Sequence, residues 1–399
     1  MSSAKLFERM RDPELIEGFL KHRSLHPNPG MDIEAEEAYI RSAEYLEHVS
    51  ALESGDYFLG LPIRKEIPKS LSNKKRTVYC FSGKEKLLLQ AMSYALHIYD
   101  ERFPDCVYSS ILGKSFKAYI QRMKNDASFG EMYAVKVDIS GYGASIDTDM
   151  LVEKLEAFFK DDIEAFSFFK WILERRDYIS NGVKEHGDMA AIPGIPIHSF
   201  FTNLYLLDMD LEVQSMCTGY CRYSDDILGF SATKEDAERL MKYFRSKIEG
   251  AHLRINEEKT SIYEPHSRFD HMGICYIDGR IDLSDYALYK LKRKMRIRAK
   301  RLRRQVEDRR LTPEDGTRLL IRLNHQTFFG KENSRELCWS RWLFPMLTEH
   351  AGLHELDLYN QRAARYVMTG KWSDSAYRVS YEKLKELGYE SLVRRYYEE

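Results

Sequence analysis

The feature that most constrains the fold is a pair of adjacent aspartates, Asp225 and Asp226, at the bend of a predicted hairpin over Gly219–Ser231. A second short segment, Met132–Ile139, is dense in apolar residues and predicts a buried strand that ends near Asp138. Carboxylates crowded at strand ends cost free energy unless something neutralises them, and hard divalent cations prefer such oxygens. We therefore expect these strand ends to form a cation site.

The order of the predicted elements indicates an α+β fold. Apolar residues at helical spacing predict helices over 84–99 and from Thr148, and Thr233 is the predicted N-cap of a third helix. Ile274–Leu283 is a second predicted hairpin, because its Asp-Gly pair suits a two-residue turn. From Ser284 onward the pattern is almost wholly helical. Strands interleaved with helices and followed by helices alone predict an α+β domain with a helical appendage.

Charge is balanced over the whole chain but not along it. Lysine plus arginine (61) nearly equals aspartate plus glutamate (62). Residues 1–60 carry 12 acidic and 6 basic side chains, whereas residues 286–310 carry 12 basic and 2 acidic ones. A polyanion would be held at the second segment and repelled from the first.

Cysteine usage and hydropathy suggest the compartment. The six cysteines are scattered, and Cys217 and Cys221 lack the second pair that a zinc site needs, so we interpret them as free thiols in a reducing compartment. The first residues lack the apolar run of a signal peptide, and the longest uncharged stretch, 189–207, holds two prolines and a glycine. We expect a cytoplasmic protein with no membrane partner.

Two metal ions held by shared carboxylates can activate a hydroxyl group and stabilise a leaving pyrophosphate, which is the chemistry of nucleotidyl transfer. An isolated Asp-Asp pair more often marks a solvated turn. The pair Asp225-Asp226 therefore gains meaning only together with Asp138 and with the motifs around them.

Seven segments between residues 57 and 285 resemble the finger and palm motifs of group II intron, retron and diversity-generating reverse transcriptases. In chain order they are Lys75-Arg-Thr-Val-Tyr, Val107-Tyr-Ser-Ser-Ile-Leu-Gly-Lys-Ser, Val137-Asp-Ile-Ser-Gly-Tyr-Gly-Ala-Ser-Ile-Asp147, Gly194-Ile-Pro-Ile-His-Ser-Phe-Phe-Thr-Asn-Leu-Tyr-Leu, Tyr223-Ser-Asp-Asp, Ile255-Asn-Glu-Glu-Lys-Thr and His271-Met-Gly-Ile.

The resemblance implies a right-hand polymerase. N-terminal helices and fingers would occupy 1–130, a ferredoxin-like palm 131–284 with an insertion around 151–190, and an all-helical thumb and C-terminal extension 285–399. The implied activity is RNA-directed DNA synthesis from dNTPs, with two Mg²⁺ ions as cofactors and Mn²⁺ as a substitute. RNA template and DNA product would be partners, with a partner protein or a homo-oligomer left open.

The resemblance also implies roles for single residues. Asp138, Asp225 and Asp226 would bind the metal ions with the Ile139 carbonyl, and Lys259 would protonate the departing pyrophosphate. Arg76 would grip the incoming triphosphate, assisted by Lys65, Lys74 or Lys75, while Pro196, His198 and Asn203 would shape the floor under the templating base. For Lys259 and the assisting lysines, a solvated surface role is the alternative.

Two places depart from the family pattern. The family usually has a bulky aromatic residue five positions after the first aspartate, where it blocks a ribose 2′-hydroxyl; Gly143 stands there, followed by Ala144. We hypothesise weakened or displaced sugar discrimination, with the alternative that Tyr142 reaches the same space. His198-Ser199 also departs from the usual Ser-Pro or Ser-Gln, which leaves an altered template grip or simple drift open.

The basic helix expected after Ser284 suits contact with the phosphates of a duplex. Its candidate nucleic-acid-binding residues are Lys290, Lys292, Arg293, Lys294, Arg296, Arg298, Lys300 and Arg301. The helical end beyond them resembles the extensions of bacterial unknown-group and abortive-infection reverse transcriptases, which implies a role in antiphage defence with a partner non-coding RNA.

Two alternatives remain at this point. The same carboxylates could extend DNA without a template or from a protein hydroxyl, for which Tyr396 and Tyr397 are conceivable primers. The non-enzymatic alternative is an RNA-binding scaffold, which the intact carboxylates disfavour.

Overall fold

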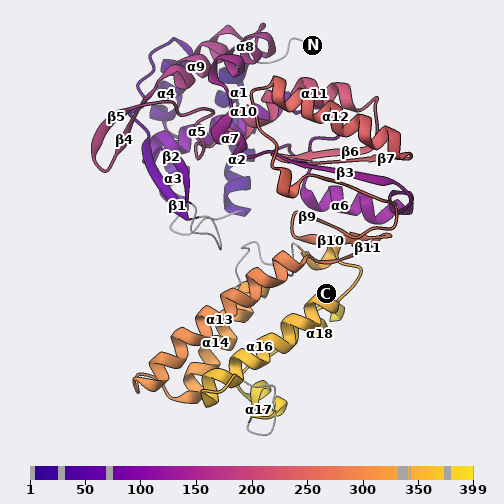
Figure 1. Ribbon diagram of the computed structural model, residues 1–399. Helices are drawn as coiled ribbons and strands as arrows, with labels where there is room; N and C mark the ends of the chain where they lie inside the picture. The colour runs from indigo at the N-terminus through magenta and orange to yellow at the C-terminus, as the bar shows by residue number, and fades with distance from the viewer. Residues whose placement is uncertain are drawn as a thin grey trace. The chain divides into compact units, whose positions relative to one another are not determined.

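The computed structural model describes residues 5–25, 32–68, 75–330, 340, 343–372 and 379–398. The chain forms two compact units (Figure 1). The first unit comprises Met1–Tyr119 and Met132–Pro265, and the second comprises Ile120–Glu131 and His266–Glu399. The predicted division into fingers, palm and thumb has other boundaries and stays a prediction.

A four-stranded antiparallel sheet forms the centre of the first unit. Its strands are β3 (Tyr133–Asp138), β6 (Thr218–Tyr223), β7 (Asp226–Ser231) and β8 (Ser261–Tyr263), hydrogen-bonded in the order β6-β7-β3-β8. Helices separate β3 from β6 and β7 from β8, which gives the β-α-β-β-α-β order of a ferredoxin-like fold. The predicted α+β fold with a ferredoxin-like palm is thus confirmed.

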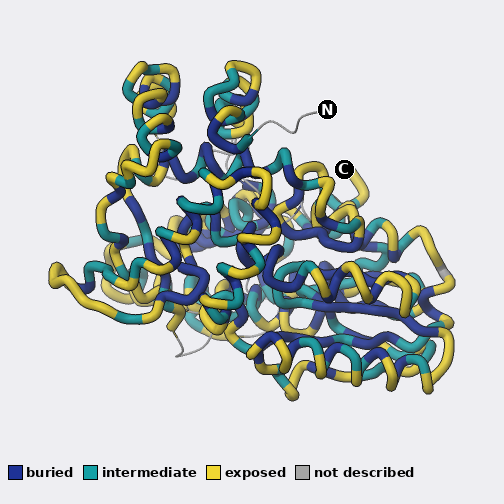
Figure 2. Tube along the Cα trace, turned by 90° about the horizontal axis from the view of Figure 1, so that it is seen from above, coloured by how far each residue is buried: buried dark blue, intermediate teal, exposed yellow. Residues whose placement is uncertain are grey.

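Apolar periodicity explains how this sheet is covered. Helix α12 (Lys234–Gly250) buries Ala237, Leu240, Phe244 and Ile248 at helical spacing and packs on β3, β7 and β8 (Figure 1). Thr233 caps the helix, as expected, by accepting a hydrogen bond from the Asp236 amide. Strands β3, β6 and β7 carry mostly buried residues (Figure 2), although β6 is an edge strand of this sheet.

Most other helices of the first unit pack into the same continuous apolar core. They are α1 (Leu6–Arg11), α2 (Pro13–Leu25), α3 (Ile33–Ile40), α4 (Ala43–Glu53), α5 (Gly83–Ala95), α7 (Tyr142–Ser145), α8 (Thr148–Phe158), α9 (Ile163–Glu174), α10 (His198–Tyr205) and α11 (Leu207–Val213), with the 3-10 helix η1 (Leu96–Arg102). The 3-10 turn η3 (Glu257–Lys259) is exposed.

A second sheet of the first unit has the strand order β2-β1-β4-β5. Its strands are β1 (Ile63–Pro68), β2 (Lys75–Cys80), β4 (Asp177–Ser180) and β5 (Val183–His186). Strands β1 and β2 pair antiparallel, and β1 meets β4 in parallel. This sheet carries the candidate triphosphate-binding residue Arg76, whereas Lys74 lies outside the described residues.

The second unit combines a small sheet with long helices. Strands β9 (Phe269–His271), β10 (Ile274–Ile277) and β11 (Arg280–Leu283) form a meander, and the predicted Asp278-Gly279 turn joins the last two. The helices are α6 (Phe116–Asn125, which spans the unit boundary), η2 (Ala127–Glu131), α13 (Asp285–Glu307), α14 (Pro313–Phe329), η4 (Phe344–Met346), α16 (Ala351–Thr369), α17 (Tyr381–Glu386) and α18 (Leu392–Glu398). Helices α13, α14 and α16 pack on one another. In the described part of the chain, no helix is long and apolar enough to cross a membrane.

Candidate active site

The three aspartates lie at adjoining ends of two paired strands. Asp138 ends β3 and stands directly opposite Asp226, the first residue of β7. Asp225 lies in the turn between β6 and β7, and its carbonyl accepts a hydrogen bond of 3.3 Å from the Ile139 amide. The sheet register therefore gathers the carboxylates that the sequence singled out, within the first unit alone.

Of the three carboxylates, the two in the hairpin lack a direct counter-charge among the described residues. In the described part of the chain, neither Asp225 nor Asp226 has a salt-bridge partner. Burial, together with the negative charges of Asp225 and Asp138, raises the pKa of Asp226 to about 6. Burial and the charge of Asp138 also raise the pKa of Asp225, although Lys259 and Arg76 partly offset this. Such a group favours either a proton or a cation.

The 3-10 turn η3 supplies two partners for Asp138. Lys259 Nζ lies 2.9 Å from one carboxylate oxygen of Asp138, and Asn256 Nδ2 donates to the other at 3.0 Å. Burial lowers the pKa of Lys259, but its hydrogen bond to Asp138 and the nearby carboxylates outweigh this, so the pKa is raised. Asn256 was not predicted from the sequence, although it stands in the same Asn-Glu-Glu-Lys segment that identified Lys259.

The donor set fits hard divalent cations such as Mg²⁺, because it consists of carboxylate and carbonyl oxygens that carry excess negative charge. No three His, Cys, Asp or Glu side chains of the described residues converge closely enough to hold an ion alone. An ion bound here would therefore need further oxygens from outside the protein, such as the phosphates of a nucleotide.

The glycine-containing loop before α10 is hydrogen-bonded to strand β2. The Tyr79 amide donates to the Pro193 carbonyl at 2.7 Å, and Gly194 has a φ of 105°. A Cβ on Gly194 would lie 2.8 Å from both the Tyr79 carbonyl oxygen and Val78 Cβ, so a side chain cannot be accommodated. Pro196 is held through its carbonyl, which accepts from Ser93 at 3.1 Å.

Comparison of the sequence with known proteins identifies the family of this chain. A sequence profile described as reverse transcriptase (RNA-dependent DNA polymerase) matches residues 65–276, which is more than half of the chain. The chain belongs to the reverse transcriptase family. No curated protein matches it.

Solved structures resemble this reverse transcriptase family member only distantly. Apo telomerase from Candida tropicalis, truncated from its C-terminal domain, is 13% identical with a TM-score of 0.42, over 56% of this chain and 55% of that chain. Telomerase from Candida albicans with a fragment of telomeric RNA is 13% identical with a TM-score of 0.42, over 89% and 66%. The BmCPV RNA-dependent RNA polymerase at elongation state is 13% identical with a TM-score of 0.45, over 73% and 31%. The chain thus spans less than two thirds of each of these proteins.

In this reverse transcriptase fold, Arg76 and the lysines near it are exposed. Arg76 lies on β2 opposite Ile67, and Lys65 lies on β1 opposite Val78. Arg76 is close enough to Asp225 to contribute a lowering effect to its pKa. This proximity is what a residue that grips a triphosphate beside the carboxylates requires. Lys65 and Lys75 are exposed, and among the residues that the structure describes no contact distinguishes one of them as its helper.

His198 occupies the space beside Gly143. A Cβ on Gly143 would lie 2.5 Å from His198 Cε1 and Nε2, so the imidazole fills the place where a side chain at position 143 would begin. His198 Nδ1 lies 2.7 Å from the Ala191 carbonyl, which fixes the ring, and burial lowers the pKa of His198. The ring is therefore a neutral group held against the Gly143 backbone.

Tyr142 and Asn203 both have buried side chains. Tyr142 is 3% exposed and its hydroxyl donates to the Thr202 carbonyl, so its ring belongs to the core and is not free to take the position of a residue at 143. Asn203 is 1% exposed, and its amide donates to the Ser109 carbonyl at 2.6 Å. The Asn203 side chain is thus buried beneath the Asp225 turn, and its role in shaping the floor under the templating base stays a prediction.

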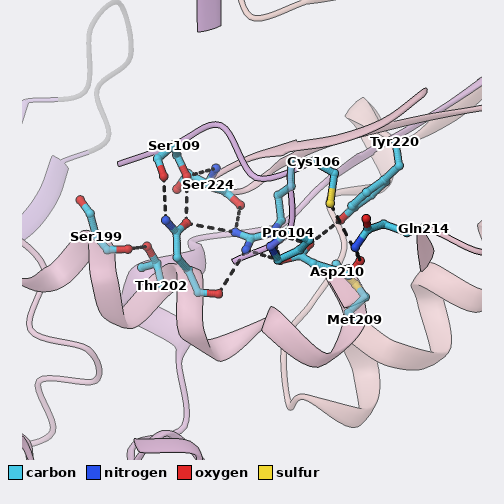
Figure 3. Close-up of polar contacts among 12 residues, drawn as sticks. Pro104, Cys106, Ser109, Ser199, Thr202, Met209, Asp210, Gln214, Tyr220 and Ser224 are labelled. Atoms are coloured by element: carbon cyan, nitrogen blue, oxygen red, sulfur yellow. Dashed lines mark hydrogen bonds and ion pairs between the residues drawn. The ribbon is translucent and has the colours of Figure 1, made fainter. Parts of the chain in front are cut away.

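A buried ion pair, which sequence reasoning missed, underlies this turn. Arg222 and Asp210 both have side chains with 0% exposure and are joined by Arg222 Nη2 and Asp210 Oδ2 at 2.5 Å. Tyr220 donates to Asp210 at 2.7 Å (Figure 3). Arg222 immediately precedes Tyr223-Ser-Asp-Asp in the sequence, but nothing local identified Asp210 as its partner.

The predicted nucleic-acid-binding residues all lie on α13 but differ in exposure. Lys294, Arg296, Lys300 and Arg301 are exposed. Arg298, by contrast, contacts the Leu323 carbonyl and the Asn324 and Thr327 side chains of α14, and Lys292 pairs with Glu355 of α16. The charged groups of Arg298 and Lys292 are thus engaged within the second unit, and nucleic-acid contact by the predicted residues stays a prediction. Lys290 and Arg293 are half-buried.

Proposed function

We propose that this chain is an RNA-directed DNA polymerase that uses two divalent cations at Asp138, Asp225 and Asp226. The observation that carries the proposal is the pairing of Asp138 with Asp226 across β3 and β7, next to Asp225, with no salt-bridge partner for either hairpin aspartate among the described residues. Membership of the reverse transcriptase family supports the same activity.

The surrounding residues have complementary tasks in this proposal. Two Mg²⁺ ions, or Mn²⁺ in their place, would activate the primer hydroxyl and stabilise the pyrophosphate charge when bound. Asp138, Asp225, Asp226 and the Ile139 carbonyl would hold them, and Arg76 would bind the triphosphate of the incoming dNTP. Lys259 hydrogen-bonds to Asp138, which keeps a protonated amine at the site as a proton donor to the leaving group.

We also propose that sugar discrimination is displaced from position 143 to His198. The imidazole occupies the volume that a side chain at Gly143 would enter, and Tyr142 is committed to the core. His198→Ala should increase incorporation of rNTPs relative to dNTPs. A dNTP preference in the variant that stays above about a thousandfold would contradict this assignment.

The exposed cations of α13 are proposed to contact the phosphates of the RNA–DNA duplex. Arg296, Lys300 and Arg301 are exposed, and no ion pair engages them in the described part of the chain. Each phosphate contact releases counterions, so affinity for a duplex should fall as salt rises, and replacing these residues by alanine should flatten that dependence. Arg298→Ala, which removes a packing contact, should lower stability instead.

The cellular role proposed is bacterial antiphage defence with a dedicated non-coding RNA as template. The support is the resemblance of the helical end to those of defence-associated relatives. Template-independent or protein-primed synthesis is the alternative for the same site, and a non-catalytic RNA-binding scaffold is the less favoured one. Sequencing the RNA and DNA bound to the protein in its host, with a search for a protein–DNA linkage, separates these cases.

The activity is tested by primer extension with purified protein on RNA and DNA templates, with dNTPs and Mg²⁺. Asp225→Asn should lower the rate of primer extension by about a thousandfold or more, because the Asp225 carboxylate would hold the cations that act on the reacting groups. Asp208→Asn is the matched control, since this aspartate is exposed on the same unit and pairs with Lys154. A wild-type protein without extension activity, or an Asp225→Asn variant as active as the control, contradicts the proposal.

A further inference from the structure

The turn that carries Asp225 has an unfavourable backbone conformation. Ser224 has a φ of 59°, in the left-handed region that side chains other than that of glycine rarely adopt. Such a conformation persists only when surrounding contacts hold it in place. The contacts that hold Ser224 therefore set where Asp225 and Asp226 lie.

Both backbone groups of Ser224 are held by buried side chains. Its amide donates to Ser109 Oγ at 3.1 Å, and its carbonyl accepts from Arg222 Nη1 at 3.2 Å. Ser109 is 6% exposed and donates in turn to Asn203 Oδ1 at 2.9 Å (Figure 3). Hydrogen bonds to both the amide and the carbonyl of Ser224 thus attach the turn to a network of buried side chains.

Arginine suits this network because all five of its N–H donors find acceptors. Nε and Nη2 bind the Asp210 carboxylate at 2.9 Å and 2.5 Å, and Nη2 also donates to the Asn203 carbonyl at 3.2 Å. Nη1 reaches the Ser224 carbonyl and, at 3.5 Å, Asn203 Oδ1. A lysine has three donors on one atom and cannot span these acceptors.

The same network joins three parts of the first unit. Asp210 lies on α11 and Asn203 on α10, while Ser109 lies in the segment that follows η1. The Arg222 amide donates to the Cys106 carbonyl at 2.9 Å, and the Tyr108 amide donates to the Arg222 carbonyl at 3.0 Å. A displacement of any of these elements would move the turn, because Ser109 and Arg222 are hydrogen-bonded to the Ser224 backbone.

We propose that Arg222 and Ser109 are positioning residues: they fix the Ser224 backbone so that Asp225 and Asp226 are set for cation binding. This inference rests on the proposed function, because it assigns the network a task in cation binding. A merely structural network would affect stability but leave cation affinity unchanged.

Ser109→Ala tests the inference, with Ser231→Ala as its matched control. Both serines are buried, at 6% and 3% exposure, but the Ser231 hydroxyl lies at the far end of β7 and has no hydrogen-bond partner among the described residues. Mn²⁺ binding by electron paramagnetic resonance, with template, a 3′-deoxy primer and a dNTP, should weaken by about tenfold in Ser109→Ala and stay unchanged in Ser231→Ala.

Hydrogen exchange of the turn gives a second readout that does not depend on activity. The Ser224 amide should exchange about tenfold faster in Ser109→Ala than in wild type, because its acceptor is lost. If Ser109→Ala matches Ser231→Ala in both Mn²⁺ affinity and exchange, the positioning role is overturned. A wild-type protein that extends no primer contradicts the proposed function instead. In that case, faster exchange of the Ser224 amide in Ser109→Ala would still support the proposal that Ser109 fixes the Ser224 backbone.

The buried pair is tested by Asp210→Leu combined with Arg222→Met, because removing one partner alone leaves a buried charge. The double variant should fold, lose the contact to the Ser224 carbonyl and require about tenfold more Mg²⁺ for half-maximal primer extension. A double variant that folds with an unchanged Mg²⁺ requirement also overturns the role of Arg222.

Discussion

Asp210 lies close in the sequence to Asp225 and Asp226, and all three carboxylates are at least partly buried. The residues around them differ, because only Asp210 has a cationic partner among the described residues. Asp210 has a fully buried side chain, but Arg222 and Tyr220 satisfy its oxygens. Asp225 and Asp226 are less buried, yet burial raises the pKa of both, helped by the charge of Asp138 at Asp225 and by the charges of Asp225 and Asp138 at Asp226. The comparison shows that burial alone does not distinguish the hairpin aspartates from Asp210; what distinguishes them is that neither has a salt-bridge partner in the described part of the chain.

The largest effect on stability is expected when the satisfied carboxylate is removed. Asp210→Ala leaves Arg222 buried without a counter-charge and should lower the free energy of unfolding by about 3–5 kcal/mol. Chemical denaturation measures this change. Asp208→Ala is the control, because its ion pair with Lys154 is at the surface, and its effect should stay within about 0.5 kcal/mol. Equal effects of the two substitutions would remove the distinction between a structural and a surface carboxylate.

Removal of an unsatisfied carboxylate should have the opposite sign. The pKa of Asp226 in the folded protein, about 6, is above its ordinary value of 3.8, so wild type loses stability as the pH rises through this window. Asp226→Asn lacks this loss and should be more stable than wild type by about 1–2 kcal/mol at pH 7 in cation-free buffer. The gain should disappear toward pH 4. Thermal unfolding of both proteins across this pH range measures the gain. An Asp226→Asn variant less stable than wild type at pH 7 would contradict the claim that the charge of Asp226 is uncompensated.

The smallest expected effect concerns the hydroxyl that completes the Asp210 site. Tyr220→Phe removes one of its hydrogen bonds but keeps the Arg222 pair, so stability should fall by about 1 kcal/mol. Primer extension and its Mg²⁺ requirement should stay as in wild type, because in the described part of the chain the Tyr220 hydroxyl bonds to Asp210 and not to a residue of the turn. A marked change in the Mg²⁺ requirement would mean that the two sets of carboxylates are coupled more tightly than their contacts imply.

The sequence predicted those features of the site that local patterns determine. Asp138 at a strand end, the Asp225-Asp226 bend and the Thr233 cap each follow from a few neighbouring residues, and the structure has all three. The α+β fold with a ferredoxin-like palm followed from the order of such segments.

What the sequence did not predict depends on distant partners. Asn203 stands in a motif that predicted a place in the floor under the templating base, but the motif did not indicate its hydrogen bond to the Ser109 carbonyl, 94 positions away. Arg298 belongs to a run of cations, and only the packing of α14 shows that its guanidinium is engaged. Periodicity identifies a charged helix, whereas tertiary contacts decide which of its charges remain free.

The most direct test of the comparison measures the cation itself. Mn²⁺ binding is followed by electron paramagnetic resonance in wild type, in Asp225→Asn combined with Asp226→Asn, and in Asp208→Asn, each with template, a 3′-deoxy primer and a dNTP. The double variant should lose affinity by about a hundredfold, whereas Asp208→Asn should bind as wild type does. Equal Mn²⁺ affinity in all three proteins would contradict the claim that Asp225 and Asp226 bind a divalent cation.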